Sequence, residues 1–302
     1  MRDAKIKDIC SCDVKDKELL ACFREKLKHW KTCLSDEKDC HSIYHQLTTL
    51  FWDHAVYRTF NEARRLSEET NDPLTGLQGT IIDLLDRNFM DSQAIAIRRL
   101  TDQRRDVVSL RSLIDEIKVN ISIYTRENYV CYDGISFDKA PDDDHHVEHS
   151  RRARHTRYDY LSGKDKDCRS RDDKLSIAVF GEMEEEITKD FVITEEVRLY
   201  VNKWVAHAAT KDNRGQYVKV LDNISLQKLD KCYQSIIRIG KKVELFVDEF
   251  LLCSVPTPQF DQLKNWDKPV VTTKELKALR EYWFERDREI KNWAKEATII
   301  HR

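Results

Sequence analysis

Glycine and proline are scarce in this chain, with 7 and 5 copies among 302 residues. A β-sandwich or β-barrel needs turns at short intervals, and so few turn-forming residues cannot supply them. Apolar residues instead recur at helical spacing, as at Leu110, Leu113, Ile114 and Ile117. With 40% hydrophobic and 35% charged residues, the composition is typical of a well-solvated helical protein. We therefore predict an all-α fold, an antiparallel helical bundle.

Charge and apolar runs exclude some classes of protein. The formal net charge is −2, so no overall positive field attracts nucleic acid, and any such binding needs a local patch. No apolar run approaches the roughly 18 residues of a membrane span, and the first residues lack a secretory signal. Nine cysteines without an export signal indicate free thiols in a reducing compartment. We expect a cytoplasmic chain with no membrane partner.

The apolar pattern predicts helices over about 16–31, 38–69, 77–100, 182–210, 222–252 and 272–297, and one more through Leu110 to Ile117. Residues 131–174 are dense in alternating charge and predict a charged excursion from the bundle, with a short helix at about 147–161. We expect a bundle over 1–255 that includes this excursion, and a C-terminal helical extension over 256–302. In the last helix, the side chains expected to face inward are Leu276, Leu279, Trp283, Ile290 and Trp293.

The strongest candidate site ends the helix predicted over 182–210. Lys203 and His207 project away from the apolar stripe, and Asn202 projects on the other flank with Arg198 one turn before it. A histidine transfers protons near neutral pH, and a cation binds phosphate. The alternative interpretation is structural: His207 interacts with the helix C-terminus, and Lys203 is an ordinary exposed lysine.

A second candidate site is a basic run within the predicted excursion. It consists of Arg151, Arg152, Arg154, His155 and Arg157. Arginine suits phosphate recognition, and the nearby Tyr158 and Tyr160 are able to stack on bases, so the run predicts RNA binding. The alternative is a solvated surface segment paired with the acidic residues on either side, 142–144 and 172–173.

Three further groups contain charged or metal-ligating side chains. Arg98, Arg99, Asp102, Arg105 and Asp106 sit at a helix junction, where ion pairing that fixes the turn is favoured over a role beside His207. Asp144, His145 and His149 resemble part of a metal site but lack a fourth ligand. The N-terminal cysteines lack compact zinc spacing. We expect neither a metal nor another cofactor.

Several segments resemble the abortive-infection HEPN proteins of the Abi-U type. They are the junction over 98–115, Val-Cys-Tyr-Asp-Gly at 130–134, Arg154-His155, the segment 158–163 and the helix end at 201–208. The resemblance covers roughly residues 40–215. It implies a HEPN-like bundle that dimerises and, in many such proteins, a metal-independent ribonuclease with an Arg-Asn…His signature. Asn202 and His207 match that signature, whereas Val201 stands where it has arginine.

Two functional hypotheses follow, and the sequence leaves open whether the chain is an enzyme. The first is a homodimeric endoribonuclease of phage defence or of the toxin–antitoxin type. It uses His207 as acid–base and Asn202, Lys203 and Arg198 for positioning and charge, and its expected partners are RNA and an antitoxin or defence protein. The second is a non-catalytic interaction or sensing module with an eroded signature. A metal-dependent hydrolase built on residues 142–149 ranks below both.

Overall fold

The structure is a computed structural model of the chain, and it describes residues 13–36, 38–69, 79–139, 144–164, 169–175, 177–206, 224–251, 260–266 and 273–299. Within these ranges the secondary structure is helical and no strand is formed. One isolated bridge pairs Thr125 with Lys174. The all-α prediction is confirmed.

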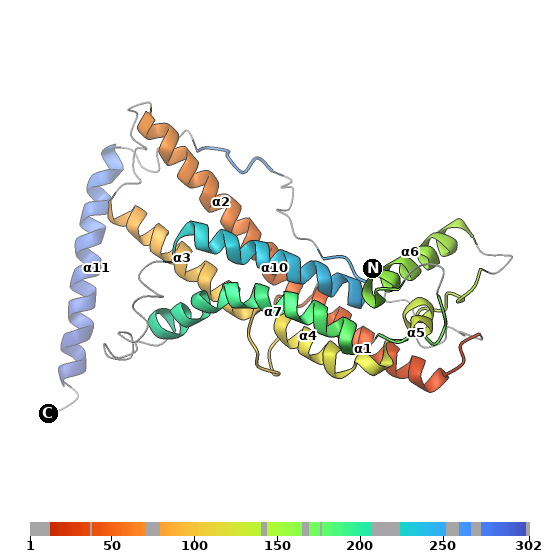
Figure 1. Cartoon of the computed structure of the whole chain (residues 1–302). Helices are drawn as coiled ribbons and strands as arrows, with labels where there is room; N and C mark the ends of the chain where they lie inside the picture. Colours follow the sequence, from red (N-terminus) through yellow and green to blue (C-terminus); the bar gives the residue numbers. More distant parts are fainter. Residues whose placement is uncertain are drawn as a thin grey trace. The chain divides into compact units, whose positions relative to one another are not determined.

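The helices follow the predicted order, with one addition (Figure 1). In chain order they are α1 (Lys17–Ser35), α2 (Ile43–Glu69), α3 (Thr80–Leu100), α4 (Leu110–Val119), the 3₁₀ turn η2 (Ile121–Ile123), α5 (Arg126–Cys131), α6 (His145–Ser162), α7 (Ile177–Tyr200), the π-helical turn η4 (Val201–Val205), α10 (Leu226–Val247) and α11 (Thr273–Ile299). The sequence pattern did not predict α5, which is short and wholly buried. In the part of the chain that is described, no helix has the length and apolar character that a membrane crossing requires.

The chain divides into two compact units. The first contains residues 1–57 and 88–256, and the second contains residues 58–87 and 257–302. Helices α2 and α3 therefore contribute residues to both units. The candidate site at the end of α7 belongs to the first.

The core of the first unit forms around α10, which packs along α7 and also contacts α4, α1 and α6 (Figure 1). The four apolar positions of α4 that the spacing predicted are all buried. They belong to one hydrophobic core with buried side chains of α1 and α10, which include Phe23, Leu27, Trp30, Leu229, Ile236, Ile239 and Val243. Burial of apolar area of this extent is the main stabilising term of such a bundle.

Local capping explains where these helices begin. The Asp16 carboxylate accepts a hydrogen bond from the Leu19 backbone N–H at 2.9 Å, at the start of α1. Ser109 and Ser112 form a capping box at the start of α4. Asp144 accepts from the Val147 N–H at 2.7 Å at the start of α6, and Gly163 ends that helix with a φ of 65°. Each cap satisfies backbone groups that a helix end leaves unpaired.

Helix α6, predicted as the middle of a solvated excursion, packs into the first unit through Tyr158 and Leu161. It carries a buried guanidinium, that of Arg154. Both terminal nitrogens of Arg154 donate to the Asp133 carboxylate at 2.6 Å, and its Nε donates to Asp248 at 2.9 Å. Burial raises the pKa of Asp133, but hydrogen bonds and positive charge from Arg154 outweigh burial and hold that pKa below its ordinary value.

A second buried guanidinium belongs to Arg126 of α5, whose side chain has no exposed area. It donates to Asp173 at 2.9 Å and to Asp159 at 2.6 Å, and it lies over the Tyr158 ring at 4.7 Å. Residues 169–175 are therefore bound to α5 and α6 by charge. A buried charge persists only when it is paired in this way.

The second unit has a small apolar interior. The ring of Phe60 packs edge-on against Trp266, with centroids 6.4 Å apart, and Arg64 donates to Asp86 at 3.1 Å. In α11, the predicted inward positions Leu276, Leu279, Trp283 and Ile290 are exposed. That prediction is wrong at these four positions, and the side chain of Trp293 lies outside the described part of the chain.

We predict that Arg154→Met lowers the free energy of unfolding by about 3 kcal/mol, because it leaves the carboxylates of Asp133 and Asp248 without their main partner. Urea unfolding measures the change. The difference in the free energy of unfolding between wild type and variant becomes smaller as the pH falls below about 4. The pKa of Asp133 is lowered in the folded protein, so its ion pair with Arg154 stabilises the fold fully above that pH, and this stabilisation is lost as the carboxylate is protonated below it. Arg152→Met, on the exposed face of α6, is the control. An equal effect of the two substitutions would contradict the account.

Candidate functional site

The end of α7 changes from an α-helix to a π-helical turn over Val201–Val205. The Ala206 N–H donates to the Val201 carbonyl at 2.7 Å and closes this turn. π-helical turns are rare and occur often at functional sites. Val201 is buried, with 1% of its area exposed, as the apolar stripe predicted. An arginine at this position would therefore point into the core.

An arginine from another helix reaches the residue beside Val201. The Nε atom of Arg98, in the last turn of α3, donates to the Oδ1 atom of Asn202 at 2.9 Å. Both side chains are half-buried. The guanidinium carries five N–H donors, and this bond uses one of them. The contact places a permanent cation at the asparagine of the candidate motif.

A second contact joins the same two helices. The Tyr200 hydroxyl donates to the Asp91 carboxylate at 2.8 Å, and the Tyr200 ring stacks on Trp204, with centroids 6.3 Å apart and planes at 11°. Burial, together with the bond to Asp91, raises the pKa of Tyr200 to about 12. Tyr200 is therefore a neutral donor at physiological pH. It fixes α3 against the π-helical turn and leaves Arg98 next to Asn202.

The other predicted residues of this site are placed differently. Arg198 donates from Nε to Glu195 at 2.7 Å, one turn earlier on α7, so its charge is paired along its own helix. Lys203 is half-buried in the π-helical turn. His207 lies outside the described residues. The structure thus brings Arg98 to Asn202 and directs Arg198 to Glu195.

The sequence favours simple ion pairing for the group around Arg98. Asp102 does fix the turn, because its carbonyl accepts from the Ser109 hydroxyl at 2.7 Å and its carboxylate contacts Arg104 at 3.4 Å. Arg98 instead contacts Asn202, and no local pattern shows a bond between residues so far apart in sequence. Asp91 and Tyr200 were missed for the same reason.

The basic run predicted to bind RNA is largely internal. The side chains of Arg151, Arg154 and His155 are buried. Arg151 donates to the Ser136 carbonyl at 2.9 Å, and the His155 Nε2 atom lies 3.2 Å from the Phe137 carbonyl. These three side chains hold α6 in place and do not face solvent. The observed partners of the run include Glu148, Asp133 and Asp248. Residues 142 and 143, which the alternative interpretation also named, lie outside the described part of the chain.

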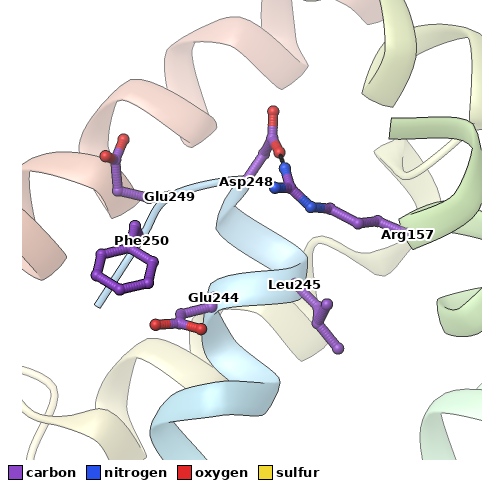
Figure 2. A pocket seen from close by; sticks show the side chains of 6 residues that line it. All are labelled: Arg157, Glu244, Leu245, Asp248, Glu249 and Phe250. Atoms are coloured by element: carbon purple, nitrogen blue, oxygen red, sulfur yellow. Dashed lines mark hydrogen bonds and ion pairs between the residues drawn. The ribbon is translucent and has the colours of Figure 1, made fainter. Parts of the chain in front are cut away.

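The two exposed members of the run also have carboxylate partners. Arg152 contacts Glu148, and Arg157 contacts Asp248, with both residues lining a pocket of about 160 Å³. Figure 2 shows this pocket and its lining, which consists of Arg157, Glu244, Leu245, Asp248, Glu249 and Phe250. Three carboxylates against one guanidinium give the pocket an acidic lining, which does not suit the phosphates of RNA.

Metal-ligating side chains do not gather in the part of the chain that is described. No group of three His, Cys, Asp or Glu side chains is placed to hold an ion there. Asp144 serves as the cap of α6, and His145 and His149 are exposed on that helix. Cys10 and Cys12 lie outside the described residues.

Comparison with known proteins gives the family. The model of the family described as AbiU2, within the HEPN class, matches residues 38–249, which is more than half of the chain. The chain therefore belongs to the AbiU2 family of HEPN proteins, and the resemblance predicted from the sequence is confirmed. Searches of curated proteins and of solved structures found no match. The matched residues include α3, α7 and the π-helical turn, while α1 and α11 lie outside them.

We predict that Arg98→Ala loosens the π-helical turn, because it removes the donor to Asn202. The expected cost in the free energy of unfolding is about 1 kcal/mol for one partly buried hydrogen bond. Amide hydrogen exchange of residues 200–206 should become faster. Arg99→Ala, at the exposed neighbouring position, is the matched control. Unchanged exchange in Arg98→Ala would show that the contact does not hold the turn.

Proposed function

We propose that the chain is a metal-independent endoribonuclease of the HEPN class that acts in phage defence. Family membership supports the class, and the abortive-infection resemblance supports the setting. One observation carries the catalytic part of the proposal: the hydrogen bond from Arg98 to Asn202. It provides, from α3, the cation that the signature lacks at Val201.

The proposed reaction is cleavage of the RNA backbone by its own 2′-hydroxyl. Neutral His207 accepts the proton of that hydroxyl as the 2′-oxygen bonds to the adjacent phosphorus. The bond from phosphorus to the 5′-oxygen breaks, and the protonated imidazole returns a proton to the leaving oxygen. The products are a cyclic phosphate and a free 5′-hydroxyl, and no metal is required.

In this mechanism Arg98 stabilises the negative charge that develops on the phosphoryl oxygens. Asn202 orients the guanidinium through its Oδ1 atom. Lys203 supplies further positive charge near the phosphate, and Arg198, which contacts Glu195, has a lesser share. We also propose a homodimer in which two such helix ends lie together, and an antitoxin or defence protein that restrains the activity.

The second candidate is a non-catalytic interaction module. Val201 at the position of the signature arginine and the pairing of Arg198 with Glu195 favour it, because the signature position is apolar and the arginine one turn earlier already has a partner. In that case the contact between α3 and α7 serves only to stabilise the fold. The two candidates predict different outcomes in the same assay.

We predict that the purified full chain cleaves RNA in the presence of EDTA. His207→Ala should slow cleavage by at least about 100-fold, the usual contribution of a general acid–base. Arg98→Ala should slow it by about 100- to 1,000-fold, as loss of a charge-stabilising donor does. Arg99→Ala, the exposed neighbour, should retain the wild-type rate.

Three outcomes would contradict the proposal. Equal cleavage by the wild type and His207→Ala would exclude His207 as the acid–base. Cleavage that EDTA abolishes would indicate a metal-dependent reaction. Absence of cleavage by the wild type, with growth inhibition of the host that persists in His207→Ala, would favour the interaction module.

A further inference from the structure

Helix α11 carries an uncovered apolar stripe. Leu276, Leu279, Trp283 and Ile290 have exposed fractions of 41, 46, 74 and 58%. The described residues of their own unit therefore do not cover them. Large exposed apolar groups in one row are typical of an interaction surface. The stripe lies beyond the family match, which ends at residue 249.

The spacing of the stripe indicates what covers it. Positions 276, 279, 283, 286 and 290 alternate steps of three and four residues, which is the a/d pattern of a two-stranded coiled coil. We call these five positions the α11 seam; Arg286 is its one charged member. Tyr282 and Phe284, which lie outside these five positions, are exposed as well. We propose that the α11 seam pairs with the α11 seam of a second copy of this chain, in an antiparallel coiled coil.

The charge of Arg286 decides the orientation. In a parallel pair each seam residue faces the same residue of the second copy, so Arg286 would lie against Arg286 of the second copy in the seam. Like charges at a buried position are strongly unfavourable. In the antiparallel pair, centred between residues 284 and 285, Arg286 faces Trp283 of the second copy. A guanidinium over an indole ring is a favourable contact.

The remaining seam positions also fit the antiparallel pair. Leu279 faces Ile290 of the second copy, so two apolar layers flank the central Trp283–Arg286 layers. The side chains in these layers are exposed in the single chain. Arg286 contacts Glu289 and lies over the Tyr282 ring, 5.4 Å from its centroid, on its own helix. Helix α11 is 27 residues long, which gives room for these layers and for further turns at both ends.

Charges beside the seam are complementary in the same orientation. Arg280 and Asp287 occupy the e positions, which face each other in an antiparallel pair. Arg280 of one copy then meets Asp287 of the other, and the two-fold symmetry repeats this pair. Lys291 contacts Asp287 at 2.7 Å along the same helix and does not cover the seam. This inference stands apart from the proposed ribonuclease activity, because the pairing surface needs neither His207 nor Arg98.

Charge reversal in the full chain tests the proposal. Sedimentation velocity over a concentration series measures the dimer dissociation constant. Arg280→Glu and Asp287→Arg should each weaken the dimer by roughly tenfold, because each single change creates two like-charge contacts. The double variant Arg280→Glu/Asp287→Arg restores opposite charges and should restore the wild-type constant. Arg288→Glu, on the outer face of α11, is the matched control and should leave it unchanged.

The rescue identifies the orientation. In a parallel pair Arg280 would face Glu275 of the second copy, so the double variant would remain weak. A monomeric wild type would show that something other than a second α11 covers the seam. A dimer that the single variants leave unchanged would place the interface elsewhere. Either result, or a failed rescue, overturns the proposal. Helix content by circular dichroism confirms that each variant is folded.

Discussion

A buried guanidinium must be met by carboxylates, and this requirement fixes the interior of the first unit around α5 and α6. Arg154 joins α6 to Asp133, which follows α5, and to Asp248, which follows α10. Arg126 joins α5 to Asp159 and Asp173. Because α10 packs along α7, the same network supports the helix whose end carries Asn202. The charged residues 131–174, predicted as an excursion from the bundle, therefore stabilise the first unit through buried ion pairs.

The spacing of apolar residues predicted most of the helices. The remaining features depend on hydrogen bonds and ion pairs between residues far apart in the sequence. The apolar stripes gave the helices and the buried positions of α4, and they placed Val201 in the core. The apolar stripes do not show whether an arginine side chain faces solvent or a distant carboxylate. Arg154, for example, donates to Asp248, which is 94 residues away in the sequence. The Arg98–Asn202 bond, across 104 residues, was out of reach for the same reason. In α11 the stripe itself was found, but periodicity does not say which surface covers it.

The candidate site combines a family signature with one substitution and one contact. Valine stands at position 201, where the signature has arginine, and this position lies in the π-helical turn with its side chain buried in the core. Arg98 brings a guanidinium to the neighbouring residue from another helix. The Tyr200–Asp91 bond holds the two helices at this point, since the raised pKa of Tyr200 keeps its hydroxyl a donor. The geometry is thus compatible with phosphate chemistry in a form that a linear motif does not reveal.

We propose that Arg98 and Asn202 act as one unit in RNA cleavage. A double-mutant cycle tests it most directly, with single-turnover rates measured for the wild type, Arg98→Ala, Asn202→Ala and the double variant. If Asn202 acts by orienting Arg98, the double variant should be no slower than Arg98→Ala. Losses that multiply would mean that the two residues act independently, and they would contradict this account of the site.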